Sequence, residues 1–153
     1  CKINYMEKIV VATNKKAFHE YNILEQFEAG IQLKGSEVKS IREGKASLKQ
    51  SYVLIRKGEA WLKGSHIASY SHTGYEGHDP VRNRKLLLHK NEIQKINSKL
   101  AEKGLTAIPT RMYIKSGFIK LEFGLAKGKK LYDKRATKKK RDVERDIKRA
   151  MKV

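Results

Sequence analysis

Cysteine, proline and long apolar segments are all scarce in this sequence. Its 153 residues include one cysteine, Cys1, and two prolines. A single thiol excludes an internal disulfide framework and is typical of proteins in a reducing compartment. Apolar runs such as IVVA at residues 9–12 are far shorter than the roughly 20 residues that cross a bilayer. With no recognisable signal peptide either, the sequence predicts a cytoplasmic protein without a membrane partner.

Acidic residues are scarce as well. Asp and Glu total 16 against 35 Lys and Arg, which leaves a formal net charge of +19. This surplus favours a polyanionic partner, and nucleic acid rather than a membrane, because no long helix combines the charges with a broad apolar face. The length allows one folded domain and an appendage. We expect a folded RNA-binding domain at residues 1–126 and a basic tail at residues 127–153.

Alternating apolar residues predict strands in the first of these two parts. In residues 27–34 (FEAGIQLK) the apolar side chains fall on odd positions, so that Glu28 faces outward. In residues 118–126 (FIKLEFGLA) the same period leaves Lys120 and Glu122 facing outward. Each strand is therefore expected to cover a core on one side only.

Glycines indicate how such strands are joined. Tight hairpins are predicted at Lys57-Gly58 and Ser116-Gly117, because glycine supplies the positive φ that these turns need. Short strands joined by close turns favour an antiparallel barrel. The expected fold class is therefore mainly β, an antiparallel barrel with two to three flanking α-helices.

Capping signals predict where the helices lie. Ser36 is the candidate first cap, with Gly44 ending that helix, and Asn91 caps a second helix that ends at Gly104. A third, shorter helix is predicted in NKKAFHE, with Asn14 as its cap.

The C-terminal tail cannot fold by itself. Between Lys127 and Val153, thirteen cations stand against four anions, which leaves +9 and few apolar residues. If the segment from Lys134 onward becomes helical, six cations share one stripe. They are Lys134, Lys138, Arg141, Arg145, Arg149 and Lys152. We therefore expect a tail that is disordered alone and helical when bound to RNA. The alternative is a solvated basic tail that raises solubility or binds any nucleic acid without selectivity.

The histidines suggest a metal site or a catalytic role, but their spacing in the sequence does not support either. His66, His72 and His78 match no zinc-binding signature. An RNA-cleaving enzyme could use His19 or His89 as a general acid or base, but almost any basic RNA-binding protein has histidines that could serve in this way. No glycine-rich nucleotide loop is present. The prediction is a protein that is not an enzyme and has no metal site or cofactor.

Two basic stretches are better suited to RNA. NKKAFHEY mixes cations with aromatic and amide groups that stack on and hydrogen-bond to unpaired bases. HDPVRNRKLLLHK places four cations, Arg82, Arg84, Lys85 and Lys90, around an apolar core strand, where they can contact phosphates. Glu28 would repel phosphate but can accept hydrogen bonds from base edges. Its alternative role is to pair with a neighbouring lysine.

Several of these stretches together resemble a known family. NKKAFHEY, EAGIQLKGSEVKSIREGK, HDPVRNRKLLLHKNEI, EKGLTAIP and GLAKGKKLYDKR occur in this order between about Ile9 and Arg135. They resemble the small protein B family of SsrA-binding proteins. The resemblance implies an oligonucleotide-binding (OB)-like barrel. It also implies a role in trans-translation: binding the tRNA-like domain of tmRNA and helping elongation factor Tu deliver it to ribosomes stalled on truncated mRNA.

The resemblance also implies roles for particular residues. Five look like the family's contacts to tmRNA: Asn14, His19, Glu28, Leu87 and Lys120. Leu87 is ambiguous, because within KLLLHK it could simply belong to the core. Gly128 and the triplet Asp133, Lys134 and Arg135 resemble the family's tail motif.

The predicted ribosomal contacts extend along the tail. They comprise Gly128, Tyr132, Asp133, Lys134, Arg135, Lys138, Arg141, Arg145 and Arg149. On a stalled 70S ribosome, the empty mRNA channel beside the 16S rRNA decoding centre would receive this tail, which folds there. The protein is expected to act as a monomer.

Two other functions compete with this adaptor role. A structural ribosomal protein with a basic extension would keep constant stoichiometry with ribosomes. An RNA-cleaving enzyme would lose its activity in His19→Ala or His89→Ala.

Overall fold

The computed structural model describes residues 8–69 and 77–129, with residues 102 and 103 as backbone only. Its helices are α1 (Lys15–Glu20), α2 (Gly35–Arg42) and α3 (Lys90–Lys103). The longer strands are β1 (Lys8–Thr13), β2 (Tyr21–Ile31), β4 (Tyr52–Arg56), β5 (Glu59–Lys63), β7 (Arg84–Leu87), β8 (Thr106–Lys115) and β9 (Phe118–Gly128). Two short strands, β3 (Ala46–Ser47) and β6 (His66–Ile67), pair with each other.

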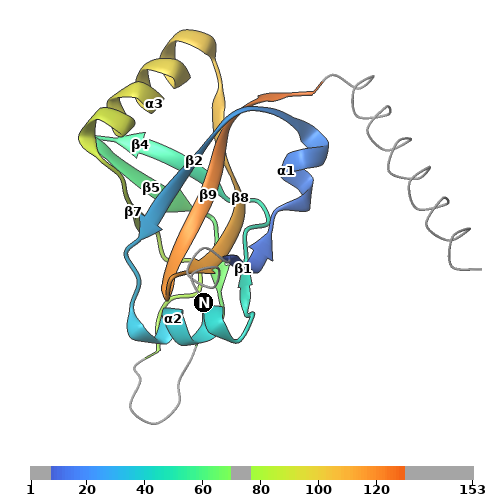
Figure 1. Ribbon diagram of the computed structural model, residues 1–153, viewed down its shortest axis with the longest axis vertical. Coiled ribbons are helices and arrows are strands. Elements are labelled where there is room, and N and C mark those ends of the chain that lie inside the picture. The colour runs from blue at the N-terminus through green and yellow to red at the C-terminus, as the bar shows by residue number, and fades with distance from the viewer. Residues whose placement is uncertain (1–7, 70–76, 130–153) are drawn as a thin grey trace, which may run out of the picture.

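The main sheet closes on itself. Its strands are ordered β1-β8-β4-β5-β7-β2-β9, and β9 also pairs with β8, so the strands from β8 round to β9 form a ring. Every one of these pairings is antiparallel. Figure 1 shows α3 at one end of this barrel, α2 at the other and α1 at its side. The predicted antiparallel barrel with flanking helices is confirmed.

Strand alternation divides the barrel wall into an inner and an outer face. Leu121, Phe123 and Leu125 of β9 are fully buried, and Phe123 stacks on Phe27 of β2 with ring centroids 5.6 Å apart. Lys120 and Glu122, which directly precede Leu121 and Phe123, are partly exposed, as the period-two pattern predicted. The charged side chains of β9 are therefore on the outer face of the barrel.

Both predicted hairpins are confirmed. Lys57 and Gly58 join β4 to β5 with φ of 52° and 73°, and Ser116 and Gly117 join β8 to β9 with φ of 51° and 80°. Two consecutive positive φ values are typical of the turn that matches strand twist.

Two helices begin two residues earlier than predicted. The cap position of α2 is Lys34, whose backbone N–H donates to Glu37 Oε1 at 2.8 Å, and that of α3 is His89, which donates in the same way to Glu92 Oε1 at 3.2 Å. In both helices, the carboxylate three residues after the cap position accepts the hydrogen bond of the cap residue's backbone N–H. Ser36 and Asn91 are therefore not needed as caps. Gly104 ends α3 with φ of 59°, as predicted.

Gly64 is a point where the backbone tolerates no side chain. Its φ is +79°, and a Cβ there would lie 2.9 Å from the carbonyl oxygen of Gln50. We expect Gly64→Ala to lower the free energy of unfolding by about 1–3 kcal/mol, because the substitution adds backbone strain and a clash. Urea denaturation measures this loss.

Gly117 provides the matched control. Its φ is +80°, but an added Cβ would have nothing within 4 Å. Gly117→Ala should therefore cost only the conformational strain, about 1–2 kcal/mol. Equal losses in the two variants would show that the contact with Gln50 has no effect.

Candidate nucleic-acid interface

One cross-strand row on the outer face joins two of the predicted RNA contacts. Gly30 of β2 is paired with Leu87 of β7 on one side and with Lys120 of β9 on the other. Because Gly30 has no side chain, the side chain of Leu87 can lie over its backbone, and a Cβ at Gly30 would be 3.4 Å from Leu87 Cδ1. A Cβ at Gly30 would lie 3.3 Å from that of Leu87.

This row forms part of a groove of about 750 Å³. Glu28, Leu87 and Lys120 all line it, so the structure brings together three of the five predicted tmRNA contacts. The cations Lys57, Lys85 and Lys90 line the same groove. The groove therefore combines four lysines with three carboxylates, those of Glu28, Glu59 and Glu92, and with several apolar residues.

Leu87 is a surface residue. It is 54% exposed, whereas its neighbour Leu86 is 1% exposed and belongs to the core. The strand alternates at this point, so only Leu86 packs inward. The alternative that Leu87 is simply a core residue is therefore wrong.

Glu28 is held in place from two sides. Tyr113 of β8 donates its hydroxyl to Glu28 Oε2, and Lys115 Nζ lies 3.5 Å from the same oxygen. The hydrogen bond from Tyr113 lowers the pKa of Glu28, and attraction to Lys115 and Lys8 lowers it further against the opposing effect of burial. The carboxylate is therefore ionised at neutral pH. The pairing with a lysine that we considered for Glu28 exists, through Lys115.

Tyr113 is a site residue that sequence reasoning missed. It is 2% exposed, and Lys8 Nζ lies 4.6 Å from the centre of its ring. Burial and the neighbouring Glu28 carboxylate raise the pKa of its hydroxyl, which stays a hydrogen-bond donor. The only signal in the sequence was the position of Tyr113 in RMYIK, opposite Lys120 across the predicted hairpin.

The other two predicted contacts, Asn14 and His19, belong to α1 and do not line this groove. Asn14 is 6% exposed, and its Nδ2 donates to the carbonyl of Pro109 at 2.9 Å. It occupies the cap position of α1 without making the expected side-chain capping bond. His19 is partly exposed in the last turn. Asn14 therefore fixes α1 to β8.

An aromatic contact lies next to α1. The Arg111 guanidinium lies 4.9 Å from the centre of the Phe18 ring and makes an ion pair with Glu122 at 3.0 Å. Lys129 Nζ donates to the carbonyl of Phe18 at 3.1 Å. These contacts join α1 to the outer face of β8 and to the end of β9.

The expectation that Arg84 contacts phosphate is wrong. Its side chain is 0% exposed, and its Nε donates to Glu37 Oε2 at 2.6 Å. Arg82 binds the other oxygen of Glu37 at 2.5 Å and is 28% exposed. Glu37 of α2 therefore forms ion pairs with both arginines, which the sequence pattern had predicted to contact phosphate.

His78, one of the histidines considered for a metal site, is buried. It is 8% exposed, and its Nδ1 and Nε2 lie within hydrogen-bond distance of Ser36 Oγ and the carbonyl of Ile67, at 2.8 and 2.9 Å. His78 thus links α2 to β6. Within residues 8–69 and 77–129, no group of His, Cys, Asp or Glu could hold a metal ion, and no helix is long and apolar enough to cross a membrane.

Most of the predicted tail contacts lie outside the described residues. These are Tyr132, Asp133, Lys134, Arg135, Lys138, Arg141, Arg145 and Arg149. Gly128 lies in β9, where it pairs with Tyr21, and the next residue, Lys129, donates its backbone N–H to Glu20. Lys127 and Gly128, which we assigned to the tail, thus belong to the sheet.

A basic antiparallel barrel with a cationic groove on its outer face defines a class of small nucleic-acid-binding proteins. Comparison with known proteins narrows that class. The family described as "SmpB protein" matches residues 11–153. The chain belongs to this family, as its sequence motifs predicted.

Relatives match over nearly their whole length. The SsrA-binding protein of Sulfurihydrogenibium sp. (strain YO3AOP1) is 56% identical over 147 residues, which are 96% of this chain and 97% of the relative. That of Geotalea uraniireducens (strain Rf4) is 54% identical over 147 residues, again 96% and 97%.

A solved structure matches in three dimensions as well. It is described as "tmRNA-SmpB: a journey to the center of the bacterial ribosome", and one of its chains has a TM-score of 0.65 and 46% identity. The match covers 78% of this chain and 84% of that one.

Proposed function

We propose that this chain is an RNA-binding adaptor of trans-translation, which binds the tRNA-like domain of tmRNA and helps bring it to ribosomes stalled on truncated mRNA. The observation that carries this proposal is the groove that brings Glu28, Leu87 and Lys120 together on the outer face of the barrel. The names of its relatives and of its structural neighbour, which refer to SsrA, tmRNA and the ribosome, support the same partners.

Each groove residue has a chemical part in this binding. Lys120 and the other groove cations contact phosphates and supply affinity that depends on salt. Leu87 offers an exposed apolar surface to a ribose or a base. The ionised Glu28 accepts hydrogen bonds from base amino or imino groups, which gives sequence and shape specificity. Asn14 and His19, which lie at α1 and outside the groove, are assigned to a separate part of the RNA interface.

The tail acts after the RNA is bound. We propose that the segment that follows β9, from Lys130 to Val153, enters the mRNA channel of the 70S ribosome when no message fills it and folds against 16S rRNA near the decoding centre. Its predicted contacts are Tyr132, Asp133, Lys134, Arg135, Lys138, Arg141, Arg145 and Arg149. Gly128, the last residue of β9, is a further predicted contact. An intact message would occupy the channel and exclude the tail, so an empty channel is the signal for rescue.

The remaining partners follow from this role. Elongation factor Tu would be reached through the tmRNA complex rather than by direct contact with the barrel. The chain would work as a monomer in the cytoplasm, where ribosomes translate. It would perform no catalysis of its own.

Replacing Glu28 by Ala is expected to reduce the preference for the tRNA-like RNA over random RNA by about tenfold, because a base contact is worth about 1–3 kcal/mol of discrimination. Affinity for random RNA should stay within a few-fold of the wild type. Filter binding of both RNAs at one salt concentration measures the ratio.

Two controls accompany this variant. Glu43→Ala removes the same charge from an exposed side chain that pairs with Lys45, and it should leave the preference unchanged. Tyr113→Phe removes the hydroxyl that holds Glu28 and tests whether orientation of the carboxylate matters. An equal change on both RNAs in Glu28→Ala would refute the specificity role.

A further inference from the structure

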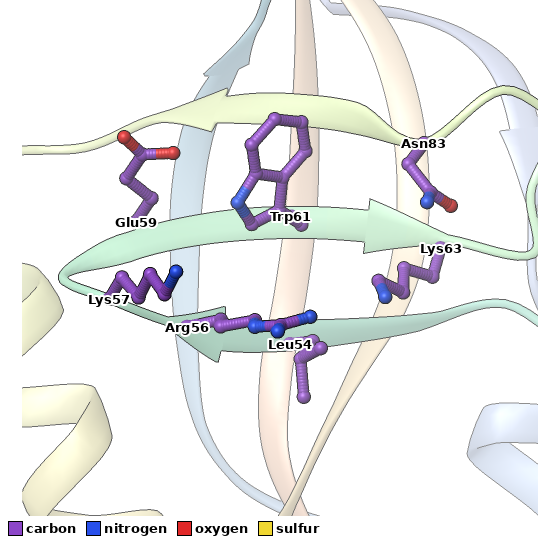
Figure 2. A pocket seen from close by; sticks show the side chains of 7 residues that line it. All are labelled: Leu54, Arg56, Lys57, Glu59, Trp61, Lys63 and Asn83. Atoms are coloured by element: carbon purple, nitrogen blue, oxygen red, sulfur yellow. The ribbon is translucent and has the colours of Figure 1, made fainter.

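A second cleft lies on the outer face of the β4–β5 hairpin, around Trp61. Trp61 is paired with Leu54 across the hairpin, and its neighbours in β5, Ala60 and Leu62, are 0% exposed. The indole therefore projects outward from the barrel wall, where it is partly exposed. Figure 2 shows the ring lying over the sheet between β5 and β7.

The cleft has the size of a site for one flat group. Its volume is about 310 Å³, which is near the lower end of ligand sites at roughly 300–1,000 Å³. It is lined by Leu54, Arg56, Lys57, Glu59, Trp61, Lys63 and Asn83 (Figure 2). A double helix or a folded peptide is too large for it, whereas a single nucleobase with its ribose is not.

The rim of the cleft is cationic. Arg56, Lys57 and Lys63 surround Trp61, and no ion pair involves any of the three within residues 8–69 and 77–129. The one carboxylate, Glu59, lies 3.7 Å from Lys85 Nζ, which offsets its charge. An anionic ligand is therefore favoured.

We propose that Trp61 stacks on one unpaired RNA base while Arg56 and Lys63 contact the phosphates on either side of that nucleotide. An aromatic face flanked by cations is the arrangement that binds single-stranded nucleic acid without reading its sequence. An uncharged small molecule would not need the cations, and an acidic peptide would not need the exposed ring face.

This site is distinct from the groove proposed to bind the tRNA-like domain. The groove and the cleft adjoin, because Lys57 and Glu59 at the hairpin line both. Only the cleft is lined by Trp61, Arg56 and Lys63. An RNA held in the groove can therefore place a neighbouring unpaired nucleotide over Trp61. The stacking site does not depend on the tmRNA assignment, because any single strand could occupy it.

Tryptophan fluorescence reports whether the cleft is occupied, because Trp61 is the only tryptophan of the chain. The full chain is titrated with a short single-stranded oligoadenylate RNA, and its tryptophan fluorescence is recorded. Stacking on the indole should quench the fluorescence in a saturable way. Binding of the oligonucleotide, seen by anisotropy of a labelled copy, without any quenching would overturn the proposal.

Substitutions separate stacking from charge. In the anisotropy assay, Trp61→Leu should weaken binding about tenfold, whereas Trp61→Phe should stay within a few-fold, because stacking on an aromatic ring is worth about 1–3 kcal/mol per base. Arg56→Ala with Lys63→Ala keeps the reporter and should lower the salt slope by about 1.4, or about 0.7 for each lost phosphate contact. The exposed Lys49, which lies elsewhere, supplies the control Lys49→Ala.

A groove variant separates this proposal from the proposed function. Lys120→Ala should weaken binding of the tRNA-like RNA but leave quenching by the oligoadenylate unchanged. If Lys120→Ala abolishes quenching as well, there is one site and the separate stacking site is refuted. If the tRNA-like RNA does not bind at all while quenching persists, only the tmRNA assignment fails.

Discussion

Glu37→Gln is expected to lower the free energy of unfolding by about 3–5 kcal/mol, because it leaves a buried arginine without its counter-charge. Arg84 and Glu37 are both 0% exposed, and their side chains meet at 2.6 Å. The amide keeps the shape of the carboxylate, so the loss reports charge rather than packing. Equilibrium urea unfolding measures it.

Two further variants test this explanation. Arg82→Ala removes the partner that is 28% exposed and should cost much less. Glu37→Leu combined with Arg84→Met removes both buried charges and should recover part of the loss, since an apolar pair tolerates burial. Recovery will be incomplete because Arg84 also donates to the carbonyls of Ser65 and Pro80. A Glu37→Gln variant within about 1 kcal/mol of the wild type would contradict the buried-pair account.

The ion pair between Glu37 and Arg84 is expected to make the protein less stable in acid. Burial by itself would raise the pKa of Glu37, but hydrogen bonds from Arg82 and from the backbone of Lys34, with attraction to Arg84, hold its pKa below the usual value of 4.5. A carboxylate with a lowered folded-state pKa contributes its full stabilisation above the unfolded pKa. That contribution is lost as the pH falls below about 4.5 and through the lower folded value. Glu37→Gln should flatten this part of the stability profile.

Combined replacement of Asp133, Lys134 and Arg135 by Ala is expected to abolish tagging of stalled chains while leaving affinity for the tRNA-like RNA nearly intact. The groove that is proposed to hold the RNA is built from residues of the barrel and of α3, none later than Lys120. The triplet lies in the segment that we propose enters the mRNA channel. A reconstituted translation reaction on a message without a stop codon measures tagging. Retained tagging would overturn the assignment of the tail.

A truncated chain provides the control for the tail. Removing residues 131–153 leaves β9 complete, since that strand ends at Gly128. Its affinity for the tRNA-like RNA should stay within a few-fold of the full chain, with a similar salt slope. A loss of orders of magnitude, with the slope reduced by about 0.7–0.9 per lost phosphate contact, would instead make the tail a general RNA clamp.

The family and the barrel could be predicted because the decisive signals are local. Alternation along residues 118–123 and the glycine at each hairpin depend on a few neighbours in the chain, and the structure places them as expected. Helix starts were less predictable. Glu37 and Glu92 satisfy the first backbone groups from inside their helices, so a serine or asparagine cap was unnecessary.

The interface was predicted only in part. Glu28 and Lys120 were assigned to the outer face from strand period alone, but Tyr113, which orients Glu28, comes from a strand 85 residues away. Leu87 could not be separated from Leu86 by composition, since both are apolar and adjacent. The register of β7 against Gly30 decides which of the two faces solvent.

Net charge, strand period and turn residues are properties of short segments, so they are enough to identify a basic, mainly β chain of the SmpB family. The folded barrel was needed to show that Arg84 is buried against Glu37, that Leu87 is exposed, and that Trp61 lies in a cationic cleft. Closing the barrel brings distant strands into register, and that register determines which charges are paired inside and which remain on the surface for RNA.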